Sequence, residues 1–490
     1  MIITELNELI TTVNDAVWTY VLIFALVGCG LWFTWRTRFV QFRMVGEMLR
    51  LLTDSAADTV EAQLREQKEG RRRHISSFQA FAVSVATRVG TGNLAGVATA
   101  IAVGGPGAVF WMWVIALVGS ATAFIESTLA QLFKQKESDS YIGGPAYYIQ
   151  RGLHQRWMAV LFAVLITLQF GLSNNSIQAN TICSAMHEAF GWSPAWVGAV
   201  LAAVALFIVF GGIQRIARFS AVLVPVMAVG YVALAVVVVV MNIGLIPHVL
   251  KVIVLDAFGV EQVLGGGLGA TIMNGVKRGL FSNEAGEGSA PNVAATAAVT
   301  HPVKQGLIQA LGVFTDTLLV CSCTAFIILI PLTSQSYALD GLNGIALTQA
   351  ALQSQVGSAG PVFVAIAIFL FAFSSIIGNY YYGEANIRFI TQGSHSSPLT
   401  PHLILTAYRI CSAGVMVMFG AVASFELVWN IVDFFMAFLT ACNLVAIALL
   451  GRYAFRLLDD YRRQKRRGIK EPVFHRRQMP ELEDELECWE

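Results

Sequence analysis

Two glycine-rich segments interrupt stretches of the sequence that are otherwise apolar enough to cross a lipid bilayer. They are residues 87–93 and residues 282–289. An irregular backbone at membrane depth exposes N–H and C=O groups that lipid cannot satisfy, so it persists only where it lines a cavity or contacts an ion or substrate. Two broken membrane helices are typical of secondary transporters. The two breaks are therefore the first candidates for a binding site.

The first break has the chemistry needed to hold a carboxylate. Gly90 and Gly92 lack side chains that would obstruct a ligand, and Thr91 adds a hydroxyl. The positive N-terminus of a half-helix attracts anions, and exposed carbonyls attract cations. We therefore expect these three residues to bind the carboxylate of a zwitterionic substrate. The alternative is that the glycines only allow close packing of helices.

The second break carries charge where charge is costly. Asn283, Glu284 and Glu287 lie in it, and an ionised side chain at the bilayer midplane costs roughly 3 kcal/mol. Asn283 is the best candidate for contact with the substrate, and Gly286 is a further one. We expect Glu284 to pair with a basic residue and so to join the two broken helices. The basic candidates are Arg88, Lys277 and Arg278.

Polar side chains inside other apolar segments supply further candidates. Asn174, Gln178 and Thr181 share one helical face by their spacing, and Gln178 is the one expected to contact substrate. Such residues also form hydrogen-bonding links between membrane helices. Glu126 and Asp316 are either proton-titrating groups or buried hydrogen-bond anchors, and the sequence leaves both roles open.

The composition indicates a membrane protein with many spans. Hydrophobic residues make up 56% of the chain and charged residues 13%, and the mean hydropathy is +0.63, which excludes a soluble globule. Seven scattered cysteines suggest no disulfide or metal framework, and a net charge of +1 does not indicate nucleic-acid binding. Runs of about 20 apolar residues can cross a bilayer. The eleven expected spans are 15–35, 78–103, 107–133, 157–186, 195–213, 218–245, 266–298, 303–332, 360–389, 402–421 and 425–450.

The distribution of Lys and Arg predicts the orientation in the membrane. These residues are concentrated in the loops 36–74 and 134–156 and in the tail from Arg452, whereas the alternate loops are nearly free of them. Because positive charge accumulates on the cytoplasmic side, the N-terminus is expected outside and the C-terminus inside.

The positions of the breaks predict an all-α fold with an internal repeat. Without the first span, ten spans remain, and the broken ones are the first and sixth of these. An odd number of helices per repeat forces the second repeat to be inverted, so the two breaks meet at the midplane. The expected organisation is an extra N-terminal helix (1–35), a cytoplasmic loop (36–76), two five-helix repeats (77–245 and 266–450) joined by an outer interfacial segment (246–265), and a cytoplasmic tail (451–490).

Five motifs spread over nearly the whole chain carry a family resemblance. They are GTGNLAGVA at 90–98, GGPGA at 104–108, FWMW at 110–113, GGPAYY at 143–148 and RGLFSNEAG at 278–286. Together they resemble the alanine or glycine:sodium symporters, a family of amino-acid transporters in the amino acid-polyamine-organocation superfamily. The resemblance implies a leucine-transporter-like fold with one extra N-terminal helix. It also implies uptake of a small neutral amino acid together with sodium across a plasma membrane, expected to be a bacterial inner membrane.

The same resemblance implies where sodium binds. It points to the carbonyls of Ala86 and Val89 and to the hydroxyls of Ser374 and Ser375, which suit a hard cation that prefers oxygen ligands. The alternative for the two serines is hydrogen bonding to the preceding helical turn. Asn93 either gives an amide oxygen to a second ion or hydrogen-bonds the break.

One residue departs from the family pattern. In the ninth span the family usually has a Trp after a Gly, whereas here Gly378 is followed by Asn379. A short amide in place of a large indole should enlarge the substrate pocket and make it polar. The substrate class therefore extends from alanine and glycine to glutamine or asparagine.

The parts expected on the cytoplasmic side have simpler interpretations. Residues 141–153 are expected to form a short interfacial helix that gates the inner vestibule or anchors it to the membrane surface. The charged loop 53–74 is expected to be exposed, and the tail from Arg452 to be a solvated appendage.

Other functional classes fit less well. Proton coupling in place of sodium stays open. An ion channel is less favoured because selectivity filters usually come from repeated loops around a symmetry axis. An enzyme is less favoured because the eight His are scattered and no HExxH, CxxC or nucleophile-elbow pattern is present. No cofactor is expected beyond sodium as the coupling ion, lipid and a small amino acid are the expected partners, and the oligomeric state stays open.

Overall fold

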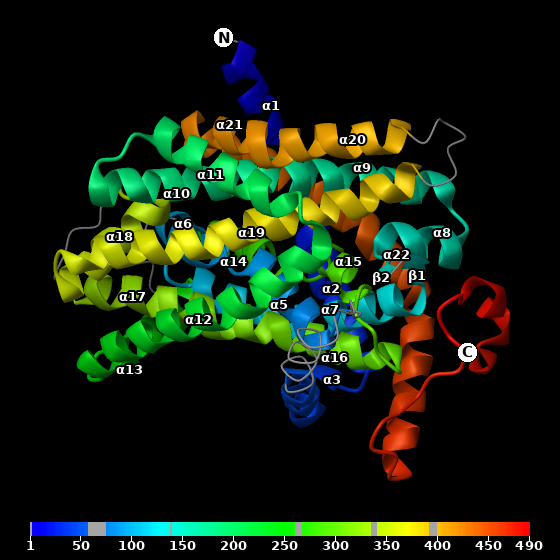
Figure 1. Ribbon diagram of the computed structural model, residues 1–490. Helices are drawn as coiled ribbons and strands as arrows, with labels where there is room; N and C mark the ends of the chain where they lie inside the picture. The colour runs from blue at the N-terminus through cyan, green and yellow to red at the C-terminus, as the bar shows by residue number, and fades with distance from the viewer. Residues whose placement is uncertain (1, 57–74, 138–139, 260–266, 335–340, 392–398) are drawn as a thin grey trace, which may run out of the picture.

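The computed structural model describes residues 2–56, 75–137, 140–259, 267–334, 341–391 and 399–490. These residues form an almost entirely helical bundle (Figure 1). One small antiparallel hairpin, β1 (Gln135–Glu137) and β2 (Ser140–Ile142), was not expected. The predicted exposed loop 53–74 lies largely outside the described residues.

The helices follow the apolar runs of the sequence. In the first half they are α1 (Ile2–Val17), η1 (Trp18–Leu22), α2 (Ile23–Arg36), α3 (Val40–Arg43), α5 (Ser77–Arg88), η2 (Gly92–Gly96), α6 (Val97–Gly104), α7 (Ala108–Leu132), α8 (Pro145–Leu153), α9 (Arg156–Leu168), η3 (Gln169–Asn174), α10 (Asn175–Phe190), α11 (Pro194–Val209), α12 (Gly212–Met241) and α13 (Ile246–Ala257). In the second half they are α14 (Leu268–Asn283), α15 (Ala290–Ala294), α16 (Pro302–Val313), η4 (Phe314–Cys321), α17 (Ser322–Thr333), α18 (Gly344–Val356), α19 (Ala359–Thr391), α20 (Leu399–Arg409), η5 (Ile410–Val415), α21 (Met416–Val422), α22 (Phe425–Arg466), η6 (Arg476–Gln478) and η7 (Pro480–Glu485).

Eight helices among the described residues are long and apolar enough to cross a membrane. They correspond to eight of the expected spans, and α11 is a shorter apolar helix at the position of a ninth. The two remaining expected spans, 78–103 and 266–298, are each interrupted inside their glycine-rich segment. The chain is therefore a multi-pass membrane protein, with its irregular backbone where the sequence predicted it.

The two ends of the bundle are built differently. In Figure 1, α13 and α18 lie at one end, and α8, the hairpin and the C-terminal residues lie at the other. The helix α18 was not predicted, because its 13 residues include polar Gln349, Gln353 and Ser354 and are too few to cross a bilayer. Its buried residues, such as Leu347 and Leu352, pack it into the bundle. The segment 141–153, expected to be an interfacial helix, does contain a helix, which begins only at Pro145.

The C-terminal tail corrects the sequence-based expectation of a solvated appendage. The helix α22 continues to Arg466, and the residues after it fold back onto the bundle. The Trp489 indole N–H donates to the Leu132 carbonyl at 3.0 Å, and the Phe474 backbone N–H donates to the Thr300 carbonyl at 2.9 Å. The side chains of Phe474, Leu486 and Trp489 are buried. These apolar residues are spaced irregularly among charges, so no periodic pattern revealed their common burial.

Replacing the tail's aromatic anchor should release the tail. In a Trp489→Ala protein, the loss of a buried indole that contributes about 3–5 kcal/mol should increase the rate of tryptic cleavage at Arg476 and Arg477 at least tenfold. Limited proteolysis followed by mass spectrometry measures this rate. Trp196→Ala is the matched control, because Trp196 is 68% exposed. Equal cleavage rates in both variants would show that the tail is not held by Trp489.

Candidate functional site

The first break is a short loss of helix that one side chain caps. The helix α5 ends at Arg88, Val89 has an extended backbone conformation, and helical structure resumes near Gly92. The Gly90 backbone N–H, which has no helical acceptor, donates to Asn93 Oδ1 at 2.9 Å. Of the two roles left open for Asn93, the structure therefore shows the one in which its amide hydrogen-bonds the break.

A buried carboxylate joins the two breaks. Asp316, in the π-helical segment η4, accepts a hydrogen bond from Asn93 Nδ2 at 2.6 Å and one from Ser282 Oγ at 2.7 Å. Thr317 Oγ1 donates to the same carboxylate at 2.9 Å. Hydrogen bonds that satisfy a buried polar group offset the cost of removing it from water, so these three donors stabilise the buried carboxyl group. Asp316 is thus a hydrogen-bond anchor between η2 and the end of α14.

The second break is held by left-handed residues and by two neighbouring helices. Glu284 has φ 57°, and Gly286 has φ +94°, a conformation that costs residues with a Cβ about 1–2 kcal/mol. The Gly286 N–H donates to Glu126 Oε1 at 3.3 Å, and its carbonyl accepts from Asn443 Nδ2 at 2.9 Å. Asn443 also donates to Glu126 Oε2 at 2.9 Å. Glu126 on α7 and Asn443 on α22 therefore fix the shape of the break.

The prediction that Glu284 forms an ion pair with a basic residue is wrong. No ion pair joins Glu284 to a basic side chain in the described part of the chain, and its carboxylate accepts from Ser289 Oγ at 2.5 Å. Lys277 and Arg278 instead approach Asp433 Oδ2 on α22, at 3.5 and 2.5 Å. The link between the breaks that was expected from Glu284 is made by Asp316.

Arg88, the third basic candidate, is hydrogen-bonded to another helix. Its Nη1 donates to the Gln309 carbonyl at 3.2 Å, beside Gly312 on α16. The guanidinium is buried, and its Nε and Nη2 have no hydrogen-bond partner within the described residues.

Two hydroxyls from α19 meet a carbonyl from α5. Ser374 Oγ and Ser375 Oγ lie 3.2 and 2.9 Å from the Ala86 carbonyl oxygen, and each also lies within hydrogen-bond distance of the Phe371 carbonyl. The serines therefore bond to the preceding turn of their own helix, which was the alternative to sodium binding, and they also lie against the end of α5. Val89 follows the last residue of α5, so its carbonyl lies beyond the regular helix. This is a group of oxygens of the kind that a hard cation prefers.

The candidate substrate contacts of the first break lie beside this oxygen group. The Thr91 N–H and its Oγ1 both donate to Gln178 Oε1, at 2.9 and 2.8 Å. A Cβ on Gly90 would overlap Ser375 Oγ and would lie 2.8 Å from Gln178 Oε1. Glycine is thus required by close approach of three helices, α5, α10 and α19. The packing and ligand interpretations of this glycine are compatible.

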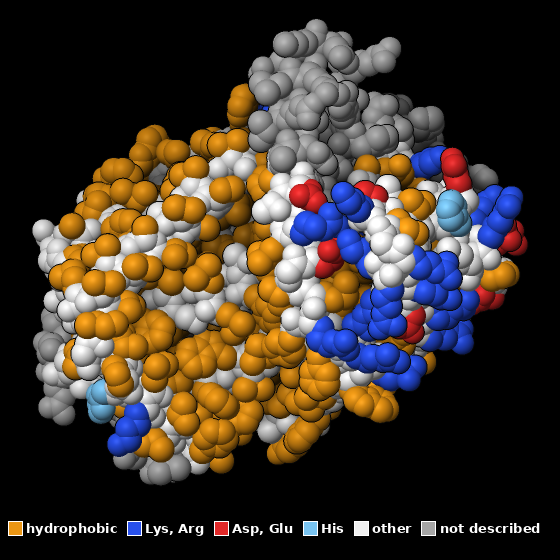
Figure 2. Space-filling model, turned by 90° about the horizontal axis from the view of Figure 1, so that it is seen from below, with side chains coloured by type: hydrophobic (Ala, Val, Ile, Leu, Met, Phe, Trp, Pro, Cys, Tyr) orange, Lys and Arg blue, Asp and Glu red, His pale blue; other side chains and the backbone are white. Residues whose placement is uncertain are grey.

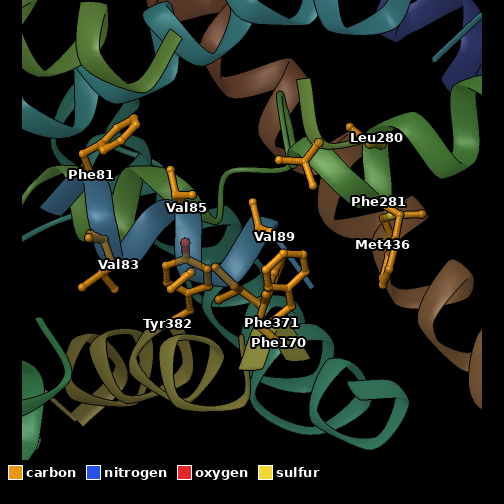
Figure 3. Close-up of a cluster of buried hydrophobic side chains, with 14 of the residues drawn as sticks. Phe81, Val83, Val85, Val89, Phe170, Leu280, Phe281, Phe371, Tyr382 and Met436 are labelled. Atoms are coloured by element: carbon orange, nitrogen blue, oxygen red, sulfur yellow. The ribbon is translucent and has the colours of Figure 1, made fainter. Parts of the chain in front are cut away.

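Buried apolar side chains surround the end of α5. Figure 3 shows Val85 and Val89 close to Phe371 and Phe170 on one side, with Phe281 and Met436 farther along. A Cβ on Gly92 would lie 3.1 Å from the Ser282 Cα, so the two breaks themselves approach closely. Such apolar walls exclude water and strengthen the electrostatic interactions inside them.

Of the remaining candidate substrate-binding residues, some lie in this region and others lie beside it. Asn379 lies one helical turn after Ser375 on the same face of α19; it is 1% exposed, and neither of its amide atoms has a partner within the described residues. Asn283 bonds within its own break, with Oδ1 accepting from the Ala285 N–H, and it donates to Thr317 at 3.3 Å. Gly286 lies against α7 and α22, apart from Gln178 and Gly90.

Two other polar residues of α10 link helices, and their polar neighbours bond locally. Asn175 donates to Ser412 Oγ at 2.9 Å, and Asn180 donates to the carbonyls of Gly420 and Ala423. Thr181 bonds to its own helix, and Asn174 accepts from Gln169. From the expected face of this helix, Gln178 is thus the residue that reaches the first break.

Comparison with known proteins decides the family. Residues 3–476 match the model of the sodium:alanine symporter family. The chain belongs to the sodium:alanine symporter family. It is a transporter and not an enzyme.

Several named relatives match this symporter family member over nearly its whole length. It is 49% identical to the probable sodium/glutamine symporter GlnT of Bacillus subtilis, over 99% of this chain and 96% of the relative. It is also 49% identical to the amino-acid carrier protein AlsT of Bacillus subtilis, over 99% and 98% of the two chains. The sodium/alanine symporter AgcS of Methanococcus maripaludis is 36% identical, over 91% and 94%.

The oxygen atoms around Ala86 are expected to bind sodium, so that sodium stabilises the folded protein. In a Ser374→Ala/Ser375→Ala protein, we expect the sodium concentration that gives half of the sodium-dependent rise in unfolding temperature to increase at least tenfold, because two oxygens are lost. Ser354→Ala is the control, since Ser354 Oγ donates to the Ala351 carbonyl of its own helix. A sodium response identical to that of the unmodified protein would exclude the two serines as ligands.

Proposed function

We propose that the protein is a sodium-coupled symporter that imports a small neutral amino acid of the alanine, glycine or glutamine class by alternating access. The observation that carries the proposal is that Gly90 lies between two sets of polar groups. Ser375 Oγ approaches it from the oxygen group, and Gln178 Oε1 approaches it from the group that includes Thr91. The relatives named as sodium/glutamine and sodium/alanine symporters support the same substrate and ion.

In this proposal sodium binds to oxygens of Ala86, Val89, Ser374 and Ser375. Binding there ties α19 to the end of α5 and so orders the first break. The amino-acid carboxylate binds at Gly90, Thr91 and Gly92, where Thr91 presents a backbone N–H and a hydroxyl, both now bonded to Gln178. Replacement of these bonds by bonds to the carboxylate would free the Gln178 amide to contact the substrate. Asn283 and Gly286 belong to the proposed contacts of the second break.

Asn379 is proposed to select the substrate side chain. A buried amide that lacks hydrogen bonds costs about 1–3 kcal/mol, and a polar ligand would recover that cost. An amino acid whose own side chain is an amide can do so, whereas alanine cannot. This supports glutamine or asparagine as substrate alongside the smaller amino acids.

Proton coupling is the second candidate. It is favoured by Glu287, which is 1% exposed and whose Oε1 has no hydrogen-bond partner in the described part of the chain. A carboxyl group in such surroundings is more stable when protonated. A relative from Bacillus sp. strain PS3, 37% identical over 82% of this chain, is named a sodium/proton-dependent alanine carrier protein.

Transport into liposomes tests both candidates. We expect the purified protein to take up labelled alanine or glutamine saturably, and at least tenfold faster with an inward sodium gradient than without one. Liposomes without protein give the background. Equal uptake with a proton gradient and no sodium would support proton coupling instead. Absence of uptake for every neutral amino acid, by protein that is folded, would contradict the proposed function.

Replacing Asn379 should change the preference between substrates. An Asn379→Trp protein should favour alanine over glutamine, because the indole fills the space of the longer side chain. Asn379→Ala keeps that space and removes the amide. It should therefore weaken the binding of glutamine about tenfold and leave the binding of alanine nearly unchanged. Competition between unlabelled glutamine and labelled alanine measures both effects. Unchanged competition in the two variants would remove Asn379 from the substrate pocket.

A further inference from the structure

A cavity of about 320 Å³ lies between the far end of α22 and the residues that follow α2. Figure 2 shows basic side chains gathered on one part of this side of the molecule, beside a wide hydrophobic surface. The basic residues that line the cavity are Arg38, Arg43, Arg462, Lys465 and Arg466. Within the described residues, Glu47 is the only carboxylate in the lining.

The Glu47 carboxylate is already engaged by other groups. It pairs with Arg50 at 2.8 Å and with Lys465 at 3.2 Å, and it accepts from Tyr461 Oη at 2.6 Å. Burial alone would raise the pKa of Glu47, but the hydrogen bonds from Arg50, Tyr461 and Lys465 outweigh it and lower the pKa to about 2. Its charge is therefore shared with Arg50 and Lys465 and does not balance the rest of the cavity.

The remaining positive charges have little to balance them. The guanidinium groups of Arg38, Arg43 and Arg466 make no ion pair or hydrogen bond in the part of the chain that the structure describes. Arg462 Nη2 donates to the Thr37 carbonyl at 2.7 Å. Burial and the positive charges of Arg43, Arg38 and Arg466 lower the pKa of Arg462, and the nearby Asp459 carboxylate offsets only part of this effect. The fold thus gathers like charges whose repulsion an anion in the cavity would relieve.

The neighbouring cavity shows that this imbalance does not follow from a basic helix alone. On another face of α22, Arg456, Arg463 and Arg467 line a cavity that also contains Asp459 and Asp460. There Arg463 lies 3.9 Å from Asp460, and Arg456 pairs with Glu481 of the tail. Within the described residues, this stretch of helix therefore contributes to one cavity that has two carboxylates in its lining and to another whose lining has Glu47 alone.

The location of the cavity indicates the kind of anion. Its first lining residue, Arg38, follows directly on the membrane span that ends at Arg36. Trp35, Phe39 and Phe42 are 68%, 51% and 48% exposed around it, as is usual for aromatic residues at the level of lipid headgroups. Clusters of four to eight basic residues just beyond a membrane helix attract anionic lipids.

We propose that this cavity binds the phosphate-containing headgroup of an anionic phospholipid, with Arg38, Arg43 and Arg466 as its principal contacts. The lipid adds negative charge to that of Glu47, the carboxylate that the described residues place in the lining. Its acyl chains lie along the exposed apolar surface of the first span. The bound headgroup thereby fastens α22 to the end of α2.

Unfolding of the full-length protein in detergent tests this proposal with defined lipids. Phosphatidylglycerol should raise the unfolding temperature, whereas zwitterionic phosphatidylcholine at the same concentration should raise it little. In an Arg43→Gln/Arg466→Gln protein the apparent affinity for phosphatidylglycerol should fall about 30-fold, the effect of two basic residues near a membrane surface. Among the described residues these two side chains have no hydrogen-bond partner, so their replacement breaks no hydrogen bond there.

An Arg463→Gln/Arg467→Gln protein is the matched control, because it removes two charges from the same end of α22 but from the neighbouring cavity. It should keep the affinity of the unmodified protein. Equal losses in both double variants would show a diffuse charge effect and overturn the site. Full stabilisation by inorganic phosphate alone would overturn the lipid as its ligand, and so would an unchanged response of the Arg43/Arg466 variant.

Discussion

The buried Asp316 carboxylate is the interaction on which the centre of this protein depends. It accepts from Asn93 of the first break and from Ser282 at the edge of the second, so one side chain fixes the position of two interrupted helices relative to each other. An ionisable group inside a membrane protein is costly to bury. Three donors on this carboxylate offset that cost, and the price is that each donor must stay in place. Removing the carboxylate would leave buried donors unsatisfied on both sides, which costs about 1–3 kcal/mol for each group.

Around this anchor, the candidate ion and substrate groups share one small residue. Gly90 separates Ser375 from Gln178, and a methyl group there would touch both. Under the proposed function, an ion at Ser374 and Ser375 and an amino acid at Thr91 are bound on opposite sides of the same backbone segment. Each would then order the residues that the other needs. Such coupling is reciprocal, so sodium and amino acid would raise each other's affinity by the same factor.

The sequence predicted those features that depend on residues close together in the chain. Glycines in an apolar run fixed both breaks, and the family resemblance indicated that Ser374 and Ser375 meet Ala86, as they do. Features that depend on distant pairing were harder to predict. Glu284 was assigned a partner among three nearby cations, but two of them pair with Asp433, whose approach depends on how α22 packs. The role of Asp316 stayed open because its donors come from three segments. The burial of Trp489 was missed because a few apolar residues among charges give no periodic signal.

Because α22 is long, a small tilt at its middle would displace its far end by several ångströms. Asn443, inside this helix, is bonded to the second break, and the same helix continues to Arg466 without interruption. At 1.5 Å per residue, that distance is about 35 Å, so a tilt of about 10° at the level of Asn443 moves the far end by about 6 Å. If a rearrangement at the second break tilts α22, the displacement of its far end would be large enough to be detected by a spectroscopic label there.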